Sequence, residues 1–422
     1  MNFYDSDKIH DLLFSHGYEK TKILDDADLI VLNTCHIREK ASEKLFSDLG
    51  RIKKLKDQKK ITIAVTGCVA QAEGNKIIDR APYVDLITGP QAFHRLPEML
   101  RGLSKGNKVT PELEFLTNDK FDNLRYSKQT AGPTAFVSIQ EGCDKFCTFC
   151  VVPYTRGAEF SRSISEIKEE IISLTEIGVC EITLLGQNVN SWHGVDALGK
   201  ERGLAYLILE IAKIKKIKRI RYTTSHPLDM DQDLILAHKE ISKLMPYLHL
   251  PIQSGSDKIL KLMNRKHSSK QYIEIIEKIR NVNPDIALSG DFIVGFPGET
   301  QTDFIDTLEL VKNVGYAQSY SFKYSSRPGT PASVLESQVP ENIKKTRLRE
   351  LQNLLFSQQR QFNSQFLDRE VEVLIEKYGE RNSQVMGRSA HMQAVYMDQS
   401  LGAIGDIKKV KISCVGQNSL KV

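Results

Sequence analysis

A regular alternation of strand-like and helix-like segments in the middle of the chain limits the fold more than any other feature. From about residue 134, short apolar runs alternate with longer amphipathic stretches of helical periodicity. Six runs predict strands, at residues 135–139, 181–185, 219–224, 247–252, 286–294 and 318–324. Because repeated β–α units give parallel strands with helices outside, we expect an α/β fold with an open (βα)6 barrel of TIM type over residues 131–360.

Polar and glycine-rich loops follow these strands, at the rim where such folds bind ligands. The loops lie at residues 186–190, 225–227, 253–257 and 295–299. Each loop taken alone is explained by ordinary turn chemistry, since Gly, Pro, Ser and Asn favour turns. Several such loops on one rim instead favour a ligand-binding cleft.

Three cysteines follow the first predicted strand with the spacing C-x3-C-x2-C, as Cys143, Cys147 and Cys150. Three thiolates can hold three irons of a [4Fe–4S] cluster and leave the fourth iron open. An open iron can bind the amino and carboxylate groups of S-adenosylmethionine (SAM). An electron passed into the sulfonium then yields methionine and a 5′-deoxyadenosyl radical. The spacing therefore predicts a SAM-binding cluster at the barrel rim.

A zinc site is the simplest alternative for these cysteines. Structural zinc takes four ligands, usually as two C-x2-C pairs or as cysteines with histidines. The first histidine after Cys150 is His193, and the sequence has no second C-x2-C pair. The spacing thus favours the cluster.

The composition agrees with an intracellular enzyme. The chain has 422 residues, of which 41% are hydrophobic, and its seven cysteines show no pairing pattern of a secreted disulfide framework. No apolar run approaches the length of a membrane span, and no secretory signal is visible. A net charge of +5 only permits a nucleic-acid partner. We expect a cytoplasmic protein with no membrane partner.

Two further cysteines follow predicted strands in an amino-terminal α/β domain, expected over residues 1–101. Strands at residues 28–34 and 61–66 run into Cys35 and Cys68. Because parallel strands end at one edge of a sheet, the two thiols should lie close together. Packing as small buried side chains is the alternative, but the matched placement favours metal ligation. A polar stretch at residues 102–130 predicts a linker to the barrel.

The carboxyl end changes pattern to a charged helix over residues 341–366 and then to short strands. The strands are expected at residues 369–376, 384–387, 394–396 and 407–413. They predict a small OB-like β-barrel over residues 361–422, a common RNA-binding platform. The candidate RNA contacts are Lys377, Arg388, Lys408 and Lys409. An ordinary solvated surface is the alternative.

Five longer motifs resemble those of the radical-SAM methylthiotransferases, and most closely the tRNA enzymes that make 2-methylthio-N6-isopentenyladenosine. The motifs lie at residues 150–157, 184–190, 250–256, 291–300 and 319–331. The resemblance implies that Cys143, Cys147 and Cys150 hold the SAM cluster and that the carboxyl-terminal barrel is a TRAM domain. With the rim loops, it gives as candidate SAM contacts Gln187, Asn188, Ser225, Gln253, Ser254, Arg265 and Asp291.

The resemblance also implies a second [4Fe–4S] cluster with three cysteine ligands, two of which match Cys35 and Cys68. The remaining cysteine normally precedes an Asp-Ser pair, which here is Asp5-Ser6, directly after the start of the sequence. The opening strand and this third cysteine are absent from the sequence as written. We expect them to be encoded upstream of Met1, or the second cluster to be impaired.

The expected reaction adds a methylthio group to C2 of N6-isopentenyladenosine next to the tRNA anticodon. An aromatic C–H bond has no acidic proton, so a radical route answers a difficulty that acid–base chemistry does not. The expected partners are the isopentenylated tRNA, an electron donor of flavodoxin or ferredoxin type and an unidentified sulfur donor, with the protein as a monomer. A sister enzyme acting on threonylcarbamoyladenosine or a ribosomal-protein aspartate stays open, as does a non-catalytic iron–sulfur RNA-binding protein. The motif at residues 151–156 favours the isopentenyladenosine branch.

Overall fold

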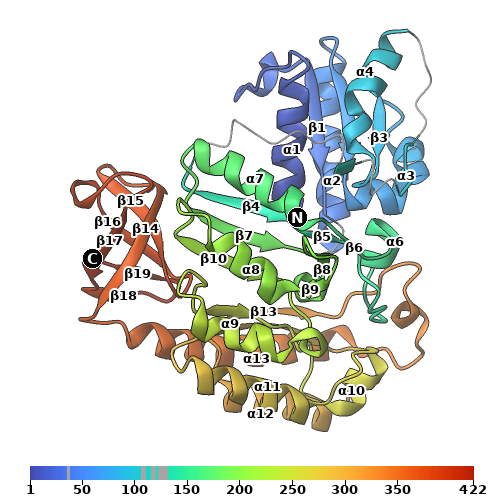
Figure 1. Cartoon of the computed structure of the whole chain (residues 1–422). Helices are drawn as coiled ribbons and strands as arrows, with labels where there is room; N and C mark the ends of the chain where they lie inside the picture. Colours follow the sequence, from blue (N-terminus) through green and yellow to red (C-terminus); the bar gives the residue numbers. More distant parts are fainter. Residues whose placement is uncertain (36–38, 106–110, 116–119, 122–131) are drawn as a thin grey trace. The chain divides into compact units, whose positions relative to one another are not determined.

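The computed structural model describes residues 1–35, 39–105, 111–115, 120–121 and 132–422. The chain forms two compact units (Figure 1). The first unit comprises residues 1–129, 141–144 and 150–160, and the second comprises residues 130–140, 145–149 and 161–422. The cysteine loop therefore contributes Cys143 and Cys150 to the first unit and Cys147 to the second.

The first unit is built on a parallel sheet with the strand order β1-β2-β3. The strands are β1 (Leu29–Asn33), β2 (Thr62–Thr66) and β3 (Leu86–Thr88). The helices of this unit are α1 (Asn2–Phe14), α2 (Glu39–Lys56), α3 (Cys68–Arg80), α4 (Leu96–Ser104) and α6 (Val152–Arg156). Ile63, Ala64 and Val65 are fully buried, because helices on both faces of a parallel sheet leave no solvated side.

The predicted linker is only partly irregular. Its first residues belong to α4, which continues to Ser104. Glu112 forms a parallel bridge to Thr88, with Glu112 N donating to Ile87 O at 2.9 Å. Residues 106–110, 116–119 and 122–130 of the predicted linker lie outside the described residues. A short bridged segment of this kind leaves no periodic signal in a sequence, and the bounds of the linker stay a prediction.

The second unit contains two parallel three-stranded sheets, with the orders β10-β7-β4 and β11-β12-β13. The strands are β4 (Thr134–Ser138), β7 (Glu181–Leu185), β10 (Arg219–Thr223), β11 (Tyr247–His249), β12 (Ala287–Val294) and β13 (Gln318–Lys323). A parallel bridge between Ile220 and Leu244 links the two sheets. This arrangement confirms the predicted open (βα)6 barrel.

Helices separate these strands in the chain and cover the barrel (Figure 1). They are α7 (Ile164–Glu176), α8 (Leu204–Ala212), α9 (Gln232–Glu240), α10 (Asp257–Leu262), α11 (Ser269–Val282) and α12 (Gln301–Val314). Ser163, Ser268 and Thr300 begin α7, α11 and α12 with reciprocal capping boxes. Shorter strands are β5 (Gln140–Glu141), β6 (Phe160–Ser161) and the hairpin of β8 (His193–Val195) with β9 (Glu201–Gly203).

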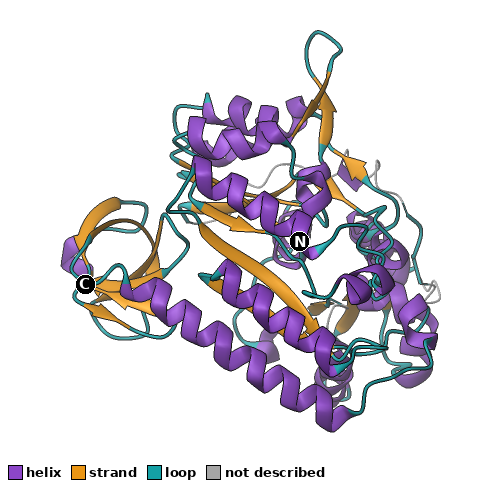
Figure 2. Ribbon diagram, turned by 90° about the horizontal axis from the view of Figure 1, so that it is seen from below, coloured by secondary structure: helices purple, strands orange, loops and turns teal. Residues whose placement is uncertain are grey.

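The long helix α13 (Glu341–Ser364) leads from the barrel into a curled six-stranded sheet, which Figure 2 shows near the carboxyl terminus. Its order is β17-β14-β15-β16-β19-β18. The strands are β14 (Glu370–Tyr378), β15 (Gln384–Ser389), β16 (Ala394–Asp398), β17 (Ile407–Lys411), β18 (Cys414–Val415) and β19 (Ser419–Lys421). The predicted small β-barrel is thus confirmed. Among the described helices, none combines the length and apolar character needed to cross a membrane.

Two buried arginines of β10 join the curled sheet to the barrel. Arg219 Nη1 donates to Arg388 O at 2.9 Å, and Arg221 Nη2 donates to Ser389 O at 2.9 Å. Glu181 lies 3.0 Å from Arg221 Nε and balances the charge. Because both guanidiniums are desolvated, these bonds are costly to leave unmade, and they fix the sheet to the barrel edge within this unit.

Candidate functional site

Cys147 lies in the second unit against the segment that follows α10. Arg265 Nη1 is 3.7 Å from Cys147 Sγ, and Arg265 Nη2 donates to Pro251 O at 2.5 Å. Asn264 Nδ2 donates to Phe146 O at 2.9 Å. The predicted cluster ligand Cys147 and the predicted SAM contact Arg265 therefore come together.

Cys143 and Cys150 lie half-buried in the first unit. Cys143 N donates to Gly157 O at 3.4 Å, and Val152 N lies 3.5 Å from Cys150 Sγ. The approach of the two loop arms requires Gly142, because a Cβ there would lie 1.9 Å from Ala158 O, and its φ is +75°. All seven cysteines are free thiols. Within the described ranges, no three His, Cys, Asp or Glu side chains are grouped closely enough to hold a metal ion, so the ligand set stays a prediction.

Two neutral histidines lie close to Arg265, and each has a buried ring atom with no hydrogen-bond partner in the described parts of the chain. His226 and His267 are 4% and 7% exposed, and their rings meet edge to face with centroids 5.7 Å apart. Burial, aided by the Arg265 guanidinium, lowers the pKa of His226 far below its ordinary value and that of His267 to about 4. Both imidazoles are therefore neutral at physiological pH.

The surroundings of each ring assign its tautomer. His226 Nδ1 accepts from Leu228 N at 3.2 Å, so its Nε2 carries the proton. His267 Nδ1 lies 3.4 Å from Ser268 O and donates to it, so its Nε2 is an acceptor. Neither Nε2 atom has a hydrogen-bond partner among the described residues. The pair thus offers a buried donor and a buried acceptor, as a polar ligand requires.

The predicted SAM contacts divide into partnered and unpartnered side chains. Ser225 Oγ and Asn188 Oδ1 are buried without a partner in the described part of the chain, although Asn188 Nδ2 donates to Asp229 at 2.7 Å. Gln187 is half-buried at the end of β7. Ser254 Oγ instead accepts from Ser256 N at 3.2 Å, so its side chain supports the loop. These observations fit a polar ligand at the rim near Cys147.

Asp291 and Gln253 lie on the same rim, where the backbone is strained at two positions. His249 Nδ1 accepts from Thr224 N at 3.2 Å, so His249 Nε2 donates to Asp291 Oδ1 at 3.2 Å. Thr224 and Gln253 have φ values of +71° and +82°, which are unfavourable for residues other than glycine. Such strain is concentrated at functional sites. The sequence predicted Asp291 and Gln253, but not the histidine that orients the carboxylate.

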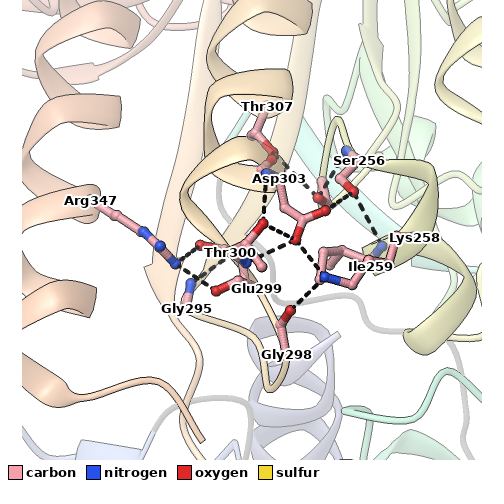
Figure 3. Close-up of polar contacts among 11 residues, drawn as sticks. Ser256, Lys258, Ile259, Gly295, Gly298, Glu299, Thr300, Asp303, Thr307 and Arg347 are labelled. Atoms are coloured by element: carbon pink, nitrogen blue, oxygen red, sulfur yellow. Dashed lines mark hydrogen bonds and ion pairs between the residues drawn. The ribbon is translucent and has the colours of Figure 1, made fainter. Parts of the chain in front are cut away.

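A polar network fixes the loop that follows β12 (Figure 3). Glu299 accepts from Gly295 N at 2.9 Å and from Arg347 Nη1 of α13 at 2.6 Å. Asp303 accepts from Ser256 Oγ at 2.7 Å and from Lys258 Nζ at 2.8 Å. Burial opposes ionisation of Asp303, but the hydrogen bonds from Lys258 and Ser256 outweigh it and lower the pKa of its carboxyl. The network holds two rim loops together.

In the first unit, Cys35 and Cys68 lie within hydrogen-bonding reach of each other. This contact lowers the pKa of the Cys68 thiol to about 6, burial opposes the shift, and the Arg156 guanidinium adds to it. Arg156 is 3% exposed and forms an ion pair with Asp5. A buried cation beside two thiols favours thiolates. Arg156 lies in the motif at residues 150–157, but the sequence alone predicted no role for it.

Further buried charges support Arg156 within this unit. Lys120 Nζ lies 2.6 Å from Glu141 Oε1 and 3.4 Å from Asp5 Oδ1. Gln91 Nε2 donates to Glu141 Oε2 at 2.7 Å. Because each charge is paired, the desolvation cost of the network is offset, and Arg156 is held in one position.

The predicted RNA contacts lie on the curled sheet. Lys377 and Lys409 are exposed. Lys408 is half-buried with its Nζ 3.5 Å from Asp406, and Arg388 Nη1 donates to Met392 O at 3.0 Å. The exposed lysines are therefore better placed than Arg388 to reach a phosphate.

Comparison with known families matches three successive parts of the chain. Residues 1–89 match the family described as Uncharacterized protein family UPF0004, residues 137–311 match the Radical SAM superfamily, and residues 366–421 match the TRAM domain. This order of domains indicates a radical-SAM methylthiotransferase. For such an enzyme the Radical SAM match implies a [4Fe–4S] cluster and SAM, and the TRAM match suggests RNA binding.

Solved structures share the fold of this methylthiotransferase-type chain at low identity. The radical SAM methyltransferase TsrM from Kitasatospora setae, with tryptophan substrate and a SAM analogue bound, is 13% identical with a TM-score of 0.58, covering 78% of this chain and 72% of its own. The cobalamin-dependent SAM radical enzyme OxsB is 13% identical with a TM-score of 0.52, covering 83% of this chain and 53% of its own. These likenesses establish the fold alone.

Proposed function

We propose that the chain adds a methylthio group to C2 of N6-isopentenyladenosine next to the anticodon of tRNA. The observation that carries the proposal is the buried donor–acceptor pair of His226 and His267, which has no partner within the described ranges. It lies beside Arg265, which contacts Cys147. The five motifs that resemble the isopentenyladenosine branch support the choice of substrate, and the TRAM match supports an RNA partner.

Cys143, Cys147 and Cys150 would hold the SAM cluster. When bound, the cluster and SAM supply the 5′-deoxyadenosyl radical that opens an unreactive C–H bond. The protein contributes position and hydrogen bonds: Arg265 Nη1 lies 3.7 Å from Cys147 Sγ. His226 and His267 offer one hydrogen-bond donor and one acceptor to SAM or to the target adenosine, while their neutral state avoids repulsion from the sulfonium.

Cys35 and Cys68 would hold a second [4Fe–4S] cluster that supplies sulfur. The low pKa of Cys68 and the nearby Arg156 support thiolate ligation there. We further propose a monomer in the cytoplasm that receives electrons from a flavodoxin- or ferredoxin-type donor. Lys377, Arg388, Lys408 and Lys409 would contact tRNA phosphates.

Nucleoside mass spectrometry of a strain that lacks the gene tests the substrate. The isopentenylated adenosine should accumulate without its methylthio group, and the intact gene should restore the product. A normal level of the methylthio product without the gene would exclude this function. Loss of the methylthio group from threonylcarbamoyladenosine or from a ribosomal-protein aspartate would assign the chain to a sister activity instead.

A further inference from the structure

A cavity of about 400 Å³ lies within the second unit, where the end of α13 meets β14 and the turn after β15. Its walls include Phe362, Phe366, His391, Arg280, Arg369 and Glu370. The cavity shares no residue with the SAM rim described above. Its volume lies in the range of about 300–1,000 Å³ typical of small-ligand pockets.

Three aromatic rings form one side of the cavity. The ring centroids are 5.5 Å apart for Phe362 and Phe366, 5.2 Å for Phe366 and His391, and 6.2 Å for Phe362 and His391. All three side chains are half-buried, so each ring retains an accessible part. Burial lowers the pKa of His391; Asp285 opposes this shift and the charge of Arg221 adds to it, so the ring is neutral at physiological pH. A neutral aromatic surface of this kind suits stacking on a planar ring.

Cationic side chains lie beside the rings. Arg369 is exposed and forms no ion pair within the described residues, whereas Lys411 Nζ lies 3.3 Å from Asp368 Oδ1. β14 pairs with β17 so that Glu370 lies opposite Lys411 and Glu372 lies opposite Lys409. Directly opposite residues project from the same face of a sheet, so both lysines lie on the face that Glu370 and Glu372 present to the cavity.

The charged side chains that line the cavity are of both signs and nearly balance: they are Arg280, Arg369, Asp285, Glu370 and Glu372. Glu372 Oε1 lies 3.1 Å from Arg219 Nη2, which neutralises it. Arg280 donates to the backbone of Gly315 at 3.4 Å and keeps its positive charge at the opposite wall. A nucleobase has apolar faces, polar edges and no net charge, and it is joined to phosphates that carry negative charge. The aromatic rings suit the apolar faces of a base, and the nearly neutral interior suits its uncharged edges. The lysines of the neighbouring strand suit the negative phosphates.

We propose that this cavity binds one unstacked base of single-stranded RNA. Arg369 and two lysines of β17, Lys409 and Lys411, would contact the flanking phosphates. Aromatic stacking beside a basic groove is the general means of holding single strands. The site shares Lys409 with the phosphate contacts assigned to the curled sheet, but it differs from them because its aromatic rings select an extruded base. It does not rest on the proposed reaction, since base binding requires neither cluster nor SAM.

Binding of a single-stranded RNA decamer that carries one 2-aminopurine tests the proposal with the full chain. Anisotropy gives the affinity, and quenching of 2-aminopurine reports stacking. His391→Ala and Phe366→Ala should each weaken binding about tenfold and reduce the quenching, whereas His391→Phe should preserve both. Arg369→Gln should lower the slope of log K against log salt by about 1 without changing the quenching. Phe356→Ala, an exposed aromatic of α13 outside the cavity, is the matched control and should bind normally.

Two results would overturn the inference. The first is unchanged affinity and quenching in both alanine variants. The second is binding of free AMP that responds to these variants while the decamer neither binds there nor competes, which would identify a free-nucleotide site. If Phe366→Ala does not fold, the comparison of His391→Ala with His391→Phe still tests the proposal, because both of these variants keep Phe366.

Discussion

Removal of the Arg347 guanidinium should destabilise the second unit through Glu299. Arg347 Nη1 is 2.6 Å from Glu299 Oε1, and the two side chains are 7% and 2% exposed (Figure 3). Arg347→Met leaves a buried carboxylate without its cation, which costs about 3–5 kcal/mol. At about 1.4 kcal/mol per factor of ten, the unfolding equilibrium constant should rise by roughly 100-fold or more.

The single tryptophan makes this measurement specific to one unit. Trp192 is the only tryptophan of the chain and is 1% exposed in the core of the second unit. Urea unfolding followed by its fluorescence should show the loss in Arg347→Met. The control is Arg349→Met, an exposed arginine on the same helix, which should change stability by less than about 0.5 kcal/mol. The double variant Glu299→Gln/Arg347→Met should recover part of the loss because no charge is left unpaired.

The stability that Arg347→Met loses relative to the parent protein should depend on pH. Burial raises the pKa of Glu299, partly offset by the Gly295 amide and Arg347, and removal of Arg347 raises it further. A carboxyl with a higher pKa in the folded state takes up protons on folding. Its contribution to stability therefore falls as pH rises from about 4.3 through the folded-state pKa. The difference in the free energy of unfolding between Arg347→Met and the parent should decrease as pH falls toward about 4. Equal stability of the two proteins at pH 7 would refute the buried ion pair.

The remaining predictions concern the site. Cys143→Ala, Cys147→Ala and Cys150→Ala should each abolish 5′-deoxyadenosine formation from SAM by anaerobically reconstituted protein, and activity retained in any one would remove that cysteine from the ligand set. Cys35→Ala and Cys68→Ala should keep SAM cleavage but lose the methylthio product, so unchanged product yield by mass spectrometry would contradict a sulfur-supplying role. His226→Phe should weaken SAM binding in equilibrium dialysis about 10- to 150-fold, because one hydrogen bond to a charged group of SAM is worth about 1.5–3 kcal/mol. An unchanged affinity for SAM would mean that His226 Nε2 does not bind SAM, and would leave the target adenosine as its ligand.

Much of the fold could be predicted because buried parallel strands leave continuous apolar runs in the sequence. β12 was expected at residues 286–294 and is observed as Ala287–Val294. β11 was expected to reach residue 252 but ends at His249, two residues before Pro251, which has no N–H for a ladder. β18 and β19 were missed, because strands of two and three residues have no measurable period.

The site could be predicted where spacing or strand ends carry a signal. Cys147 follows from its spacing, and the structure sets it beside Arg265. Asp291 lies inside β12 and was predicted through the family resemblance. His267 lies in a turn after α10 with no periodic context, and only tertiary packing places it 5.7 Å from His226. The Glu299–Arg347 ion pair joins residues 48 positions apart. A single sequence holds no local trace of such a pair.

Reaction of the reconstituted protein with matched tRNAs tests the central claim most directly. The protein, SAM and dithionite are combined anaerobically with tRNA that carries N6-isopentenyladenosine and with the same tRNA lacking the isopentenyl group, and the nucleosides are analysed by mass spectrometry. We predict 2-methylthio-N6-isopentenyladenosine from the isopentenylated tRNA only. Failure to form it in protein that cleaves SAM, or equal methylthiolation of both tRNAs, would contradict the account.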